Sequence, residues 1–260
     1  MMHHPCQLAY HVIDGPEMTY GSLVIHGLTG TPATLASITQ PLISSGFRVV
    51  APCLAGHGGT LEDLARSTWP EWYETVRIAY SELRREVDRV FFVGLSMGTL
   101  LGLKLAMDEG WGVRALALIG TPLHLGLKAR LAIPLVRYSP MRWIMRSVPK
   151  NFEDSVCDPQ GRMLYQQLSL PAIPVRAAFE LADLARIVRA DLGRVSNPLL
   201  LIHGHHDRVC PPSNVDLLRQ RIASDVVETA ILTRSSHVVS MDYEKDAAAC
   251  TTIDFFRRFL

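Results

Sequence analysis

A serine flanked by glycines is the feature of the sequence that most directly suggests chemistry. Ser96 is the middle residue of a Gly-Leu-Ser-Met-Gly motif at 94–98, which follows the apolar run 89–93 and precedes a helical pattern at 99–107. A sharp strand-to-helix turn needs small flanking residues and leaves the serine hydroxyl exposed above the strand end. Although serine is also common as an ordinary helix cap, this context predicts that Ser96 is a nucleophile.

A serine hydroxyl needs a neighbouring base, which is usually histidine. His237 lies in a loop after the last predicted strand, and Asp207 lies in a loop after the apolar run 199–202. A strand–serine–helix turn of this kind is followed along the chain first by an acid and then by a histidine. We expect Asp207 to hold His237 in the correct tautomer. The alternatives are a surface histidine, a helix-capping aspartate before Pro211, and Asp242 as a rival acid.

Acyl transfer also needs donors for the negative charge that develops on the carbonyl oxygen. We expect one donor to be the backbone N–H of Met97, directly after the nucleophile. The second should come from the turn at 26–30, which follows the apolar run 23–25. Leu28 is the natural donor there, because glycines at 27 and 30 let the backbone turn tightly beside a ligand.

Four other histidines offer alternatives to this interpretation. His203, His205 and His206 precede Asp207 in a pattern that resembles metal ligands, but no second cluster of ligands follows downstream. His57 lies in a glycine-rich loop but precedes the serine, so its chain order is wrong for a base. We therefore expect no metal and no cofactor.

Short apolar runs alternate with longer helical patterns along most of the chain, which predicts a mostly parallel sheet covered by helices on both faces. The predicted strands are 23–25, 48–51, 90–93, 115–119, 199–202 and 226–232, with a weaker edge strand at 8–13. The predicted helices are 34–45, 69–87, 99–107, 211–222 and 243–259.

The stretch between Pro122 and Asn197 breaks this alternation. It shows no clear strand, and its helical pieces are interrupted by prolines. We interpret it as an insertion over the carboxyl edge of the sheet, where open α/β sheets bind ligands. The expected organisation is a core formed by 1–121 and 197–260, with a cap insertion at 122–196.

The composition excludes several classes of protein. The chain has 260 residues, 48% of them hydrophobic, and a formal net charge of +1, which gives no sign of a nucleic-acid partner. Its N-terminus lacks the basic start and apolar run of a signal peptide, and no stretch is long and apolar enough to span a membrane. Five cysteines without a Cys-x-x-Cys pair favour free thiols. A cytoplasmic location is the expectation.

With these residues in hand, the chain resembles the bacterial carboxylesterases and monoacylglycerol lipases of the α/β-hydrolase superfamily. The resemblance rests on five segments in the family's order, namely 26–30, 54–72, 94–98, 203–212 and 236–242. It implies the α/β-hydrolase fold, with Ser96, Asp207 and His237 as triad. Thr99 departs from the pattern, since the family usually has a second glycine there, and its side chain could shift the helix start.

The expected activity is hydrolysis of a carboxylic ester or monoacylglycerol through an acyl-enzyme on Ser96. The alternatives are a thioesterase, an acyltransferase or a carbon–carbon hydrolase with the same triad, or a non-catalytic ligand-binding protein on this scaffold.

The segment 123–150 carries six basic residues and no acidic one, interleaved with apolar residues. Such a segment could contact a lipid surface. The alternative is a solvated basic face over a buried apolar face.

Overall fold

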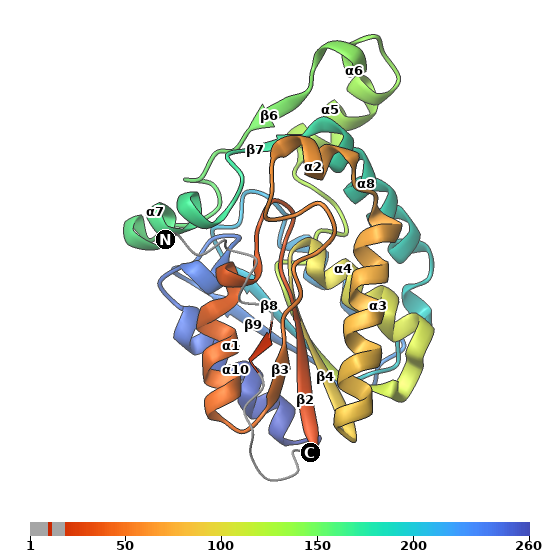
Figure 1. Cartoon of the computed structure of the whole chain (residues 1–260), viewed down its shortest axis with the longest axis vertical. Coiled ribbons are helices and arrows are strands. Elements are labelled where there is room, and N and C mark those ends of the chain that lie inside the picture. The colour runs from red at the N-terminus through yellow and green to blue at the C-terminus, as the bar shows by residue number, and fades with distance from the viewer. Residues whose placement is uncertain (1–9, 12–18) are drawn as a thin grey trace.

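A seven-stranded sheet forms the centre of the molecule (Figure 1). The computed structural model describes residues 10–11 and 19–260. The strand order is β1-β3-β2-β4-β5-β8-β9, with β1 antiparallel to its neighbour and the other pairings parallel. The strands are β1 (Tyr10–His11), β2 (Tyr20–Ile25), β3 (Arg48–Val50), β4 (Arg89–Leu95), β5 (Val113–Ile119), β8 (Leu199–Gly204) and β9 (Val227–Leu232). The predicted edge strand 8–13 lies mostly outside the described residues.

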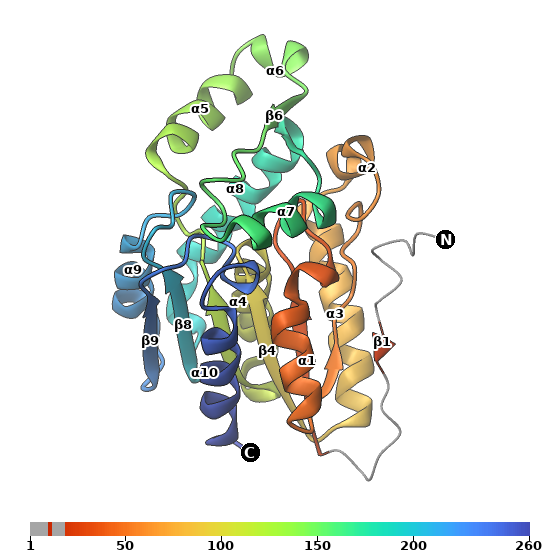
Figure 2. The same ribbon diagram turned by 90° about the vertical axis from the view of Figure 1, so that its left-hand side faces the viewer.

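Helices cover both faces of this sheet (Figure 2). On one face, α1 (Ala36–Ser44) packs against α10 (Lys245–Arg257) over a core that includes Phe47, Phe91 and Phe256. The other face is covered by α3 (Trp69–Glu86), α4 (Met97–Glu109), α8 (Val175–Ala190) and α9 (Ser213–Arg221). The central strands β4, β5 and β8 are buried almost throughout, as strands covered on both faces must be.

The shorter elements connect these layers. Helix α2 (Leu61–Arg66) begins at a capping box, in which Thr60 and Asp63 satisfy each other's backbone N–H groups. The single-turn 3₁₀ helices are η1 (Pro32–Leu35), η2 (Gly110–Gly112), η3 (Leu192–Arg194) and η4 (Val239–Met241).

The segment between β5 and β8 extends above the carboxyl ends of the parallel strands (Figures 1 and 2). It contains α5 (Leu127–Arg137), α6 (Met141–Ile144), β6 (Ser147–Pro149), α7 (Pro159–Leu168), β7 (Ala172–Pro174) and α8. The expectation of no strand here is wrong, because β6 and β7 pair in antiparallel fashion. Three residues per strand are too few to leave a recognisable alternation in the sequence. Helix α8 packs on α2, α3 and α4, so the insertion ends inside the core layer.

The expectation of free thiols is only partly met. Cys157, Cys210 and Cys250 are free, but Cys53 is disulfide-bonded. Sequence spacing does not reveal which sulfur atoms approach within bonding distance, because that depends on the folded backbone. Among the described helices, none has both the length and the apolar character needed to cross a membrane.

The packing of α4 on β4 generates a prediction about stability. A Cβ atom at Gly102 would lie 2.2 Å from the fully buried ring of Phe92. Gly102→Ala should therefore lower the free energy of unfolding by about 1–3 kcal/mol, despite the better helix propensity of alanine. At Gly193 an added Cβ would meet the carbonyl oxygen of Arg221 at an ordinary 3.7 Å. Gly193→Ala should change stability by less than about 0.5 kcal/mol. Urea unfolding of both variants checks this, and equal stabilities would contradict it.

Candidate active site

The serine predicted as nucleophile lies in a strained turn at the carboxyl end of β4. Ser96 has φ 52° and ψ −118°, a backbone conformation that residues other than glycine rarely adopt. Neighbouring backbone leaves no room for a side chain at either flanking glycine. A Cβ at Gly94 would lie 2.6 Å from the carbonyl carbon of Gly98. A Cβ at Gly98 would lie 2.2 Å from the carbonyl oxygen of Ile25. The turn therefore exposes part of the Ser96 side chain above the sheet.

Thr99, the departure from the family pattern, fits into this turn. Its side chain is buried, and its hydroxyl donates a hydrogen bond of 2.6 Å to the carbonyl oxygen of Ser96. Its backbone N–H donates to the same oxygen at 2.8 Å. The extra atoms of Thr99 thus support the first turn of α4, which begins at Met97.

The three residues predicted as a triad are brought together from three separate loops. The Nε2 atom of His237 lies 2.8 Å from the Oγ atom of Ser96, and its Nδ1 atom lies 2.8 Å from Oδ2 of Asp207. Asp207 and His237 are buried. A carboxylate on Nδ1 fixes the tautomer that leaves Nε2 free to accept the serine proton. This arrangement can activate a hydroxyl for attack on a carbonyl carbon.

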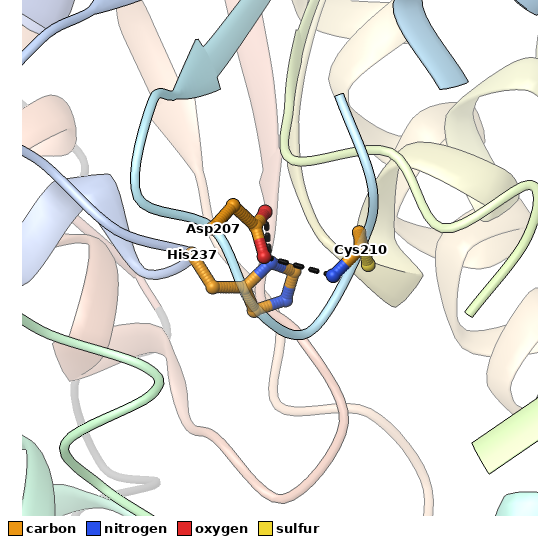
Figure 3. A group of neighbouring side chains, drawn as sticks. All are labelled: Asp207, Cys210 and His237. Carbon is orange, nitrogen blue, oxygen red and sulfur yellow. Dashed lines mark hydrogen bonds and ion pairs between the residues drawn. The ribbon is translucent and has the colours of Figure 1, made fainter. Parts of the chain in front are cut away.

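Hydrogen bonds hold the Asp207 carboxylate in place. Its Oδ1 atom accepts the backbone N–H groups of Val209 and Cys210, both at 2.8 Å. Figure 3 shows Asp207 between the His237 ring and the Cys210 backbone. Burial by itself would raise the pKa of Asp207, but His237 and the hydrogen bonds outweigh it and hold the pKa below its usual value. The carboxylate therefore stays ionised beside the imidazole.

The histidines that resemble metal ligands in the sequence lie in different environments. His205 and His206 are exposed and contact each other edge to face, whereas His203 is buried with Nε2 3.3 Å from Oδ2 of Asp207. A different group, formed by Asp207, Cys210 and His237, has ligand-type atoms within 4.8 Å of one another. The carboxylate oxygens in that group already accept backbone and imidazole hydrogen bonds. The geometry thus favours a hydrogen-bonded dyad over a set of metal ligands.

The turn predicted to stabilise an oxyanion lies against the nucleophile. A Cβ at Gly27 would lie 3.2 Å from the Cβ of Ser96, which shows how closely the backbone passes. The Gly30 N–H donates to the Gly27 carbonyl at 3.1 Å and closes the turn around Leu28. Met97, the other predicted donor, is the first residue of α4.

A buried pair of histidines supports this turn from below. The Nδ1 atom of His26 lies 2.9 Å from the carbonyl oxygen of Gly27, and its Nε2 atom accepts the N–H of Leu54. His57 packs edge-on against His26 and Trp72. Burial lowers the pKa of His26 to about 4, and burial together with His26 lowers that of His57 to about 3. Both rings are neutral at physiological pH, which suits them to a structural role beside this turn.

Asp242, the rival acid, is engaged elsewhere. Its carboxylate is fully buried and accepts four backbone N–H groups at 2.8–2.9 Å. The donors are Cys157, Asp158, Ser236 and Tyr243. Asp242 therefore joins the insertion to the loop that carries His237.

A parallel sheet with a serine at the turn after its central strand β4 defines the α/β-hydrolase fold, as predicted from the sequence. Residues 22–244 match the family described as serine aminopeptidase, S33, and the chain belongs to this family.

Comparisons with individual proteins agree with this assignment. The chain is 29% identical over 255 residues to a thermostable monoacylglycerol lipase of Bacillus sp. (strain H-257), covering 96% of this chain and 97% of that protein. It is 20% identical over 237 residues to a carboxylesterase of Bacillus subtilis (strain 168), covering 91% and 92% of the two chains.

A solved structure from work on LipS and LipT, two metagenome-derived lipolytic enzymes, superimposes with a TM-score of 0.83 at 27% identity, over 95% of this chain and all of that one. The resemblance to α/β-hydrolase esterases and lipases is thus confirmed, and ester hydrolysis is the activity that these comparisons support.

Sequence reasoning missed several residues around the site. It treated Asp242 only as an alternative acid, His203 only as a candidate metal ligand, and Lys150 only as one of the six basic residues of 123–150. In the structure Lys150 contacts Thr29 of the turn at 26–30. No local motif marks Lys150 or the bonds of Asp242 to Cys157 and Asp158, because these partners are distant in the chain. The Lys150–Thr29 pair, for example, is separated by 121 positions.

The bonds of Asp242 predict a stability effect. Asp242→Asn replaces an acceptor oxygen with an amide that faces N–H donors, leaving buried donors unpaired. The free energy of unfolding should fall by about 2–4 kcal/mol. Asp225→Asn, at an exposed position, makes the same chemical change and should have an effect below about 0.5 kcal/mol. Thermal unfolding of the two variants checks this, and matching midpoints would contradict the role of Asp242.

Proposed function

We propose that this protein is a serine hydrolase that cleaves carboxylic esters, with Ser96, His237 and Asp207 as its catalytic triad. The observation that carries the proposal is the continuous chain of two 2.8 Å contacts from Ser96 through His237 to Asp207. The complete arrangement favours catalysis over a ligand-binding role on the same scaffold, because a binding module has no need of an activated hydroxyl.

In the proposed reaction, Nε2 of His237 takes the proton of Ser96 as Oγ attacks the ester carbonyl carbon. The backbone N–H groups of Leu28 and Met97 stabilise the resulting oxyanion. The carbon–oxygen bond to the alcohol then breaks, and His237 returns the proton to that leaving oxygen. A water molecule, deprotonated by the same histidine, attacks the acyl-enzyme, which releases the carboxylic acid and restores Ser96.

Monoacylglycerol or another single-chain ester is the substrate class that the relatives favour, since one is named a monoacylglycerol lipase and another a carboxylesterase. The same triad chemistry serves thioesterases, acyltransferases and carbon–carbon hydrolases, which remain the alternatives. A hydrolysis screen over esters and thioesters of increasing acyl length distinguishes them. The cytoplasmic location expected from the sequence belongs to the same proposal and is tested by cell fractionation.

The triad proposal predicts the following. Ser96→Ala should lower ester turnover by about 10⁴- to 10⁶-fold, because the nucleophile is lost. Asp207→Asn should lower kcat by about 10⁴-fold, because the histidine takes the wrong tautomer. A fluorophosphonate probe should form its adduct on Ser96, located by peptide mass spectrometry.

Ser45→Ala is the matched control, since that side chain lies at the opposite end of the sheet beside β3, and it should leave turnover unchanged. Full activity in Ser96→Ala, or an adduct on another serine, would refute the assignment. A catalytically inert wild type that the probe does not label would instead favour the ligand-binding alternative.

The same proposal includes contact with a lipid surface through the cap. Helices α5 and α6 expose large apolar side chains, including Leu127, Leu131 and Leu135 at a spacing of four residues on one helical stripe. Trp143 and Ile144 are 73% and 81% exposed. These apolar side chains do not form the buried face that the alternative requires. Within α5 the buried residue is Val136.

Four of the six basic residues of 123–150 are exposed near this surface, namely Lys128, Arg130, Arg142 and Arg146. The other two are engaged in the fold. Arg137 forms a two-bond ion pair with Asp183 and lies over the ring of Phe179. Lys150 is hydrogen-bonded below the cap. Exposed cations beside exposed apolar groups are the combination that interfacial binding to anionic lipid requires.

Vesicle binding tests this part of the proposal. Arg142→Ser with Arg146→Ser should weaken binding to anionic phosphatidylglycerol vesicles by roughly 10- to 30-fold, since each cation contributes on the order of 1 kcal/mol. The control is Arg85→Ser with Arg89→Ser, an equal change of charge at exposed positions near the amino end of β4. Co-sedimentation at low and high salt measures both. Failure of the wild type to sediment at low salt would refute lipid contact.

A further inference from the structure

Lys150 connects the insertion to the turn beside the nucleophile. It follows β6, and its Nζ atom donates hydrogen bonds to three hydroxyl groups. These are Thr29 Oγ1 at 3.0 Å, Tyr165 OH at 3.1 Å and Ser169 Oγ at 2.8 Å. An ammonium group has three N–H donors, so the three acceptors match its capacity.

The charge of Lys150 has no carboxylate partner among the ion pairs of the described residues. Its ammonium instead lies 4.2 Å from the ring centroid of Tyr165 and 4.7 Å from that of Phe152. Tyr165 is the titratable group that faces it, and burial raises the pKa of this phenol to about 12, so Tyr165 stays neutral. Lys150 is thus committed to hydroxyl and aromatic partners.

Thr29 needs such support because its backbone is strained. It has φ 68°, in the left-handed region that β-branched residues avoid, and its side chain is buried. Such conformations persist only where the surroundings impose them. Two groups of the insertion do so: the Leu170 N–H donates to the Thr29 carbonyl at 2.9 Å, and Lys150 holds the hydroxyl.

We propose that Lys150 is a positioning residue for the oxyanion turn, which holds Thr29 in its strained conformation and thereby aims the preceding N–H of Leu28 at the substrate. The inference rests on the proposed function, because it needs the turn to serve an oxyanion. Lys150 acts through the turn and does not itself touch the reacting atoms.

Replacing the ammonium tests the inference. Lys150→Met keeps an unbranched side chain that is one atom shorter, and it removes all three hydrogen bonds. With a short-chain, water-soluble ester, kcat should fall about tenfold to a hundredfold, because misplaced donors stabilise the transition state less well. KM should change by less than about twofold. Affinity for a boronic acid, whose adduct with Ser96 places an oxygen at the oxyanion position, should fall by the same factor as kcat.

Arg85→Met is the control, because it also replaces a long cationic side chain by methionine but at an exposed position of α3, and it should leave kcat unchanged. If Lys150→Met is poorly folded, Ser169→Ala removes one partner of the ammonium and should give a smaller loss in the same direction. Unaltered kcat, or a loss confined to KM, refutes the inference.

The pH profile gives a second readout. Burial lowers the pKa of Lys150 to about 7, so its proton is lost as the pH rises through that value. A neutral amine keeps only two N–H donors and loses its charge, so one of the three hydroxyl groups must turn and donate to the amine lone pair instead of accepting. The wild-type kcat should therefore decline above about pH 7, and Lys150→Met should lack this decline. A wild-type kcat that holds to pH 9, or an equal decline in both proteins, contradicts the role of Lys150.

These outcomes separate the inference from the proposed function. A wild type without Ser96-dependent ester turnover would refute the function itself. Normal wild-type turnover with an undiminished Lys150→Met variant would refute only the positioning role.

Discussion

The close approach of α4 to the end of β2 is the constraint on which the rest of the structure depends. It brings the Gly98 backbone against the carbonyl of Ile25, where a side chain of any size would collide. The chain can then turn from β4 into α4 only through the positive φ of Ser96. Because both elements belong to a tightly packed core, the strain at Ser96 is maintained by the burial of neighbours such as Phe92 and Leu100. The hydroxyl is thus held above the sheet before any substrate arrives.

Backbone hydrogen bonds stabilise two buried carboxylates that have different partners. Asp207 and Asp242 are both stabilised by backbone N–H groups, which replace the water that a carboxylate loses on burial. Asp207 accepts two such groups and keeps Oδ2 for the Nδ1 atom of His237. Both oxygens of Asp242 accept backbone N–H groups, and these bonds hold the loop that carries His237 in place. The two aspartates therefore differ in whether one carboxylate oxygen is left free of backbone bonds to accept the hydrogen bond of His237.

The insertion connects to the site at its base and exposes apolar groups at its tip. The backbone N–H of Cys157 donates to Asp242 beside the loop that carries His237, and that of Leu170 donates to Thr29 of the turn at 26–30. At the other end, side chains such as Trp143 and Ile144 face solvent. The segment between β5 and β8 is therefore joined to the turn at 26–30 by Leu170 and by the contact between Lys150 and Thr29.

The sequence by itself determined the alternating architecture, the elbow at Ser96 and the order of Asp207 and His237, because these features depend on local composition and on chain order. It placed the major helices and strands of the core to within a few residues, because a long apolar periodicity indicates helix or strand from the local sequence alone. It did not reveal the short strands of the insertion, the disulfide at Cys53, or the bonds of Asp242 and Lys150. The bond of Asp242 to Cys157 and that of Lys150 to Thr29 join residues far apart in the chain, and only the tertiary structure brings their atoms within bonding distance.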